Sequence, residues 1–166
     1  MQRNGINMDA AYRKNQTNLI FSGIAIIAFG IWSALKLIFY MGTNRAAVLM
    51  NLGFMAADVE SPEIVMNIAA GIIIGFSVLF HLFLGWSAIR DAIGKMRFRL
   101  YIPIAAIYGF GVFSSYVDEL FSHRVDVTYG TLFISFIIDM TSVAALVFII
   151  VSSKNLKKIR REKAKA

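Results

Sequence analysis

The sequence contains no cysteine and only two histidines. The missing cysteines exclude disulfides, thiol catalysis, and every metal or iron–sulfur site that needs a cysteine ligand. With two histidines and no cysteine, a zinc site is unexpected. The sequence has no glycine-rich loop followed by lysine, which is the usual phosphate-binding motif. It also shows no nucleophile and base at a spacing that would bring them together. We therefore expect no enzyme activity, no metal and no cofactor.

Charged residues are also scarce. They make up 16% of the 166 residues, whereas about 25% is usual for a soluble domain. Hydrophobic residues make up 58%, and they are concentrated in long apolar blocks. This combination predicts one compact, all-α integral membrane protein rather than a soluble domain with a large core.

Four of these blocks are long enough to cross the hydrocarbon core, which needs about 20 helical residues. The first block is longer than the apolar part of a signal peptide and has no convincing cleavage site, so we interpret it as a retained helix. Each block offers one polar or small face that a bundle interior would accept, which predicts an antiparallel four-helix bundle. The predicted transmembrane spans are residues 17–41, 63–90, 100–121 and 128–153.

Basic residues are distributed unevenly between the two sides of the predicted spans. Fourteen of the 17 Lys and Arg lie in the N-terminal segment, the middle loop and the C-terminal tail. Six of the ten acidic residues lie on the opposite side, in the two remaining loops or at the adjacent ends of the spans: Asp58, Glu60, Glu63, Asp118, Glu119 and Asp126. By the positive-inside rule, both termini and the middle loop are predicted to be cytoplasmic. We expect the protein to reside in a cytoplasmic membrane, and we favour a bacterial one.

The predicted spans divide the chain into a cytoplasmic segment of residues 1–16, a membrane domain of residues 17–153 and a basic tail of residues 154–166. The apolar segment 46–57 in the first external loop is too short to span the bilayer. It can lie on the outer surface as an interfacial helix or enter the membrane as a re-entrant segment. The surface helix is the favoured interpretation.

One carboxylate, Asp139, falls near the middle of the fourth predicted span. At a rise of 1.5 Å per residue it lies within about 2 Å of the mid-plane of that span. Helical spacing places it in one stripe with three hydroxyl residues, Thr131, Ser135 and Ser142. Intramembrane acids are costly and functional by default. Asp139 is therefore predicted to be a proton or cation site, an assembly contact, or one half of a buried ion pair.

Two basic side chains are candidate partners of Asp139. Lys36 lies about 10 Å to the external side of its own mid-plane, and His81 about 7 Å to the cytoplasmic side. The long stem of Lys36 could reach down to Asp139 or snorkel outward. His81 is a candidate relay towards the cytoplasm, or a bundle residue hydrogen-bonded to Ser or Asp. Asp118 and Glu119 would concentrate cations at the outer mouth.

Small residues at i, i+4 spacing predict close helix packing. They occur as Gly71 with Gly75 in the second span, and as Gly30 with Ala34 in the first. Such pairs carry information about packing and none about function.

The basic tail directly follows the fourth span. Topology control and attraction to anionic lipid are its simplest interpretation, and docking of an acidic protein is the alternative. Aromatic residues do not alternate with the charges, so no nucleic acid is expected. The candidate lipid or partner contacts are Lys154, Lys157, Lys158, Arg160 and Arg161.

Two functions are compatible with these features. The first is a small membrane protein that passes a proton, cation or small solute through Asp139. Because four helices barely enclose a solute path, this function implies a homo-oligomer. The second is a non-transporting subunit that assembles with another membrane protein and docks a partner or anionic lipid with its tail.

Overall fold

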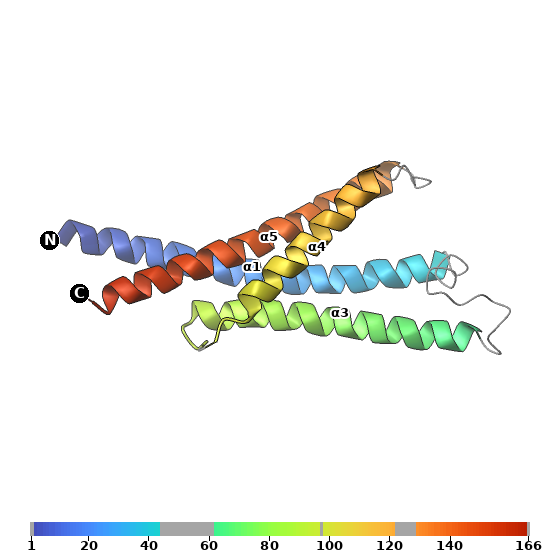
Figure 1. The fold of residues 1–166 in the computed structure, drawn as a ribbon, viewed down its shortest axis with the longest axis horizontal. Coiled ribbons are helices and arrows are strands. Elements are labelled where there is room, and N and C mark those ends of the chain that lie inside the picture. Colours follow the sequence, from blue (N-terminus) through green and yellow to red (C-terminus); the bar gives the residue numbers. More distant parts are fainter. Residues whose placement is uncertain (1, 44–61, 97, 122–128, 166) are drawn as a thin grey trace.

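The computed structural model describes residues 2–43, 62–96, 98–121 and 129–165. This part of the chain is helical and contains no strand, as the sequence predicted. The predicted external segment 46–57 lies outside the described residues. The four helices are α1 (Gln2–Thr43), α3 (Pro62–Ala92), α4 (Tyr101–Phe121) and α5 (Tyr129–Lys163) (Figure 1).

Three helices are long and apolar enough to cross a membrane: α1 over Met8–Phe39, α3 over Asn67–Ala92 and α5 over Phe136–Lys163. Helix α4 has a shorter apolar stretch, Tyr101–Ser115, at the position of the third predicted span. The length and composition of α1, α3 and α5 therefore suggest insertion into a membrane.

Helices α1 and α5 are much longer than their predicted spans. Helix α1 has 42 residues, which at 1.5 Å per residue amounts to about 63 Å, twice the thickness of a hydrocarbon core. It begins at Gln2, and α5 continues to Lys163. The N- and C-termini lie at the same end of the molecule, where these two extensions lie near each other (Figure 1). We call this end the termini end.

The helices are arranged as two pairs. Helix α1 packs along α3 and also contacts α5, whereas α4 packs on α5. Among the described residues, α1 and α4 do not approach within 8 Å between Cα atoms. Figure 1 shows the α4–α5 pair diverging from the α1–α3 pair towards the end opposite the termini. The two pairs consequently separate at the end opposite the termini.

The buried core reflects this arrangement. It contains Leu19 and Ile26 from α1, Leu84 from α3, and Ile149 from α5, all with no exposed surface. Many large apolar side chains instead point outward, including Phe76 with 70% of its surface exposed. In water such a surface would drive aggregation, but in a bilayer lipid tails cover it. The distribution of apolar side chains therefore fits a membrane environment.

Glycines allow α1 and α3 to approach closely at two levels. A Cβ atom added to Gly23 would lie 2.7 Å from the carbonyl oxygen of Gly85, and one added to Gly30 would lie 2.8 Å from Cγ of His81. Ala34 follows on the same helix and is nearly buried. The other predicted pair behaves differently, because no described atom lies within 4 Å of a Cβ added to either of its glycines, Gly71 and Gly75.

Candidate functional site

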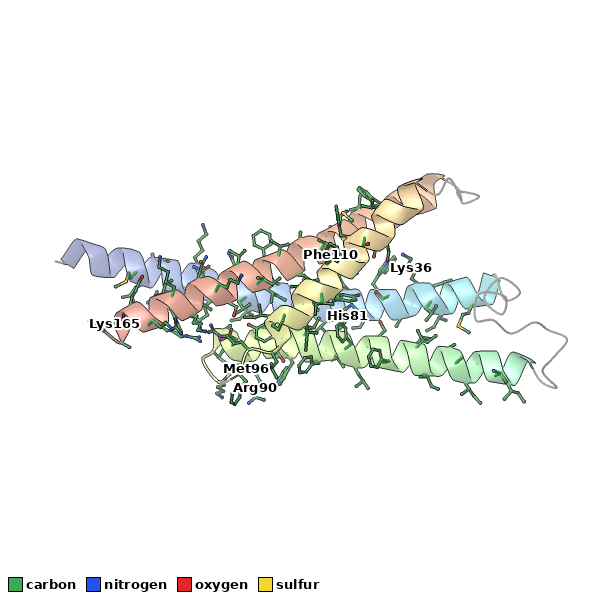
Figure 2. All side chains as sticks on the ribbon, viewed as in Figure 1. Lys36, His81, Arg90, Met96, Phe110 and Lys165 are labelled. Atoms are coloured by element: carbon green, nitrogen blue, oxygen red, sulfur yellow. The ribbon has the colours of Figure 1, made fainter. Side chains whose placement is uncertain are left out.

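A charge pair joins α1 to α5 in the apolar part of the molecule. Nζ of Lys36 lies 3.2 Å from Oδ2 of Asp139. The Lys36 side chain is 48% exposed and that of Asp139 is 23% exposed, so the pair is not sealed inside the protein. Figure 2 shows Lys36 extending from α1, between the two helix pairs. Of the two candidate partners of Asp139, Lys36 is the one whose contact with the carboxylate is seen.

His81 on α3 is buried, with 2% of its surface exposed. Its Nδ1 lies 2.7 Å from the carbonyl oxygen of Ser77, and its Nε2 lies 3.0 Å from the hydroxyl of Tyr108 on α4. A carbonyl oxygen can only accept, so Nδ1 of the neutral ring must carry the proton. Nε2 is then the acceptor, and the Tyr108 hydroxyl donates to it.

Tyr108 on α4 is the partner of His81. Its ring packs edge-on against His81, with 5.3 Å between the ring centroids. Its hydroxyl also lies within electrostatic range of the Asp139 carboxylate. Lys36, His81, Tyr108 and Asp139 thus bring one polar side chain from each of the four helices into one region, which we call the central cluster. The sequence pointed to three of these residues, and Tyr108 is the one it did not single out.

Of the five remaining residues of the predicted transport path, the structure describes the side chain of one. Ser142 lies one turn from Asp139 and is buried. The side chains of Thr131, Ser135, Asp118 and Glu119 lie outside the described part of the structure, and their predicted roles stay predictions.

A second polar cluster lies at the termini end and is centred on Asp91, in the last turn of α3. The Asp91 side chain has no exposed surface. Its Oδ1 accepts from Nε and Nη2 of Arg99, at 3.1 and 2.8 Å, and from Nη1 of Arg160 at 3.2 Å. Its Oδ2 accepts from the hydroxyls of Tyr101 at 2.6 Å and Ser153 at 2.5 Å. We call these five residues the Asp91 network.

The same region supplies hydrogen-bond donors to the C-terminal end of α3. The last carbonyls of a helix lack partners within the helix. Nη2 of Arg160 donates to the carbonyl oxygens of Asp91 and Ala92, at 2.7 and 3.2 Å, and Nε2 of Gln16 donates to that of Ala92 at 3.3 Å. Side chains from α1 and α5 therefore cap α3.

Sequence reasoning did not single out Asp91. One signal was available, because the negative end of the helix dipole disfavours a carboxylate in a last turn. An acid at such a position requires compensating cations. The two that bind it, Arg99 and Arg160, lie in the middle loop and in the tail, where the sequence analysis treated the basic residues as topology signals.

The basic tail is helical and packs against the beginning of α1. Lys163 forms an ion pair with Asp9, and its ammonium lies 5.1 Å from the centroid of the Tyr12 ring. Nδ2 of Asn155 donates to Oδ1 of Asn15 at 3.3 Å. These contacts fix the orientation of the α5 extension about its axis.

Within the described ranges, no three His, Asp or Glu side chains are grouped so that they could hold a metal ion. No protein-family model, curated protein or solved structure matches this chain. Its function is therefore inferred from the geometry of the central cluster and the Asp91 network.

Proposed function

We propose that the protein passes a proton, cation or small solute across the cytoplasmic membrane, with the Lys36–Asp139 pair as its mid-membrane charge site. In this proposal the four helices form an antiparallel transmembrane bundle. Both termini lie in the cytoplasm, because fourteen of the 17 basic residues lie on that side of the predicted spans. Since one copy encloses little space, the working unit is a homo-oligomer.

The ion pair carries this proposal. A single charge at the bilayer centre costs about 2.5–3.5 kcal/mol on insertion scales, and pairing opposite charges lowers that cost. A purely structural pair would be expected to be sealed, whereas nearly half of the Lys36 side chain is exposed between the helix pairs. Protonation of Asp139 would remove its attraction for Lys36, so occupancy by a proton or cation would change the contact between α1 and α5.

In this proposal, a proton leaves the pair through the central cluster. Tyr108 lies within electrostatic range of Asp139 and donates to His81, which lies on the cytoplasmic side of Asp139 in the predicted topology. Hydroxyl and imidazole groups can both accept and release a proton. In the proposed mechanism Asp139 takes up the proton or cation, and Tyr108 with His81 forms the inner part of a proton path.

Proton or cation flux into vesicles tests this proposal. We expect wild-type protein reconstituted in liposomes to acidify or load the lumen under an imposed gradient, and Asp139→Asn to reduce the rate at least tenfold. Asp9→Asn is the matched control, because it neutralises an exposed acid near the termini and should leave the rate unchanged.

Equal flux through wild type and Asp139→Asn, above that of empty vesicles, would exclude Asp139 as the site. Absence of flux through the wild type, together with co-purification of unrelated subunits in mild detergent, would favour the accessory-subunit hypothesis.

A further inference from the structure

The α5 extension has two differently used faces. The basic residues on its inner face are bound within the protein. Arg160 contacts Asp91, and Lys163 contacts Asp9. Arg160 was grouped by sequence with the candidate lipid contacts, but its guanidinium is directed into the Asp91 network instead.

The outer face is formed by five exposed basic residues, and no described acidic side chain forms an ion pair with them. They border a shallow hollow of about 300 Å³, together with one acidic residue, Glu162. Their spacing of three, four, seven and eleven residues from the first places them on one side of the helix. The local charge is therefore strongly positive. The outer basic face consists of Lys154, Lys157, Lys158, Arg161 and Lys165.

Side chains at the level where this face begins mark a membrane surface. Phe98 and Leu100 are 72% and 68% exposed in the connection between α3 and α4, beside the Arg99 and Tyr101 that bind Asp91. Trp86, 60% exposed, lies about one turn before Asp91 on α3. Exposed aromatic residues at this level are typical of the bilayer interface. Figure 2 shows Lys165 near the end of α5, beyond the level of Arg90 and Met96.

The length of the face matches the reach of a charged membrane surface. From Lys154 to Lys165 the helix rises about 16 Å. The headgroup layer is about 5–7 Å thick on each side of the hydrocarbon, and screening in physiological salt extends over a further 8 Å or so. The first residues of the face can contact headgroups directly, and the last ones remain within the surface potential.

We propose that the outer basic face binds anionic phospholipid headgroups in the leaflet at the termini end. Each basic residue near such a surface contributes about 1 kcal/mol of attraction. The face is presented in one orientation because the Asp91 network and the Lys163–Asp9 pair fix α5. This binding depends on membrane insertion but not on transport, so a failed flux assay would leave it standing.

Lipid competition on the full-length protein tests the inference. Detergent-solubilised protein would be titrated with phosphatidylglycerol and phosphatidylcholine, and bound lipid counted by native mass spectrometry. We expect preference for phosphatidylglycerol, which Lys157→Gln/Lys158→Gln/Arg161→Gln weakens by about tenfold to a hundredfold. Inorganic phosphate, added in a separate titration, should not displace the lipid at equal concentration.

The matched control is Lys14→Gln/Arg90→Gln/Lys95→Gln, which removes three exposed basic residues at the same end but off the face. It should weaken the preference at least about threefold less than the face variant does, because its three residues come from three different segments and do not share one helix face. Equal losses in both triple variants, or no preference in the wild type, would overturn the inference. Binding of poly-L-glutamate without a preference for phosphatidylglycerol would assign the face to an acidic protein instead. Circular dichroism would verify that both variants are folded.

Discussion

Arg160 and Asp91 are 69 positions apart in the sequence, and Nη1 of Arg160 lies 3.2 Å from Oδ1 of Asp91. This contact joins the extension of α5 to the last turn of α3. Because Arg160 also donates to two α3 carbonyls, a single side chain both neutralises the acid and caps the helix. The Asp91 network therefore joins α3 to α5 at the termini end.

Loss of the Asp91 carboxylate should destabilise the protein strongly. Asp91→Ala leaves two guanidinium groups facing a buried site without their anion, and breaking a buried pair in this way costs about 3–5 kcal/mol. We expect a clear drop in the unfolding temperature in detergent, measured by circular dichroism. Asp9→Asn removes an exposed pair and should shift the same transition little. A small effect of Asp91→Ala would show that the network contributes little to stability.

The sequence predicted the helices well because long apolar runs reveal spans directly. The predicted span 17–41 lies within α1, and 100–121 nearly coincides with α4. Hydropathy could not show that α1 starts at Gln2, since residues 2–16 are not an apolar run. That extension contacts the basic tail through Tyr12, Asn15 and Asp9.

The clusters were only partly predictable. Asp139 was recognisable because it is a single acid in an apolar run. Its pairing with Lys36 could not be predicted, because it depends on how α1 crosses α5. The depth estimates differed by roughly 10 Å, a difference that the two side chains bridge together because both extend towards the contact. The Asp91 network depends on pairings across 62 and 69 positions, which no local spacing reveals.

Alanine substitution of Gly30 and Gly71 should have different effects on stability, because Gly30 lies at a close helix contact and Gly71 on an open helix face. Gly30→Ala places a methyl group against His81, and such overpacking costs about 1–3 kcal/mol. Gly71→Ala meets open space and should be neutral or slightly stabilising, because alanine favours helix by about 1 kcal/mol. Thermal unfolding in detergent measures both. A Gly71→Ala variant that loses stability only as an oligomer would locate a subunit contact at that glycine.

The Lys36–Asp139 pair should show coupling in a double-mutant cycle. Lys36→Met and Asp139→Asn each leave one polar partner in the apolar region, whereas the double variant removes both charges. We expect the double variant to be less destabilised than the sum of the single variants, with a coupling of about 0.5–3 kcal/mol. Unfolding temperatures and flux would be measured on the same four proteins. Additive losses would show that the two side chains act independently.

Replacement of Tyr108 should change the histidine as well as the flux. In the wild type the carbonyl of Ser77 requires the proton on Nδ1 of His81, and nitrogen NMR shifts of the imidazole should report that tautomer. Tyr108→Phe removes the donor to Nε2, so we expect altered Nε2 shifts and a slower proton flux. His123→Gln simplifies the assignment, because the chain has only these two histidines.

Tyr101→Phe provides the comparison for Tyr108→Phe. It also removes one hydroxyl from α4, but that hydroxyl binds Asp91 and not the histidine. We expect it to lower the unfolding temperature while leaving the His81 shifts and the flux per folded protein unchanged. If the two tyrosine variants slow the flux equally, without a change at His81, then Tyr108 acts through stability alone. The inner proton path would then have to avoid His81.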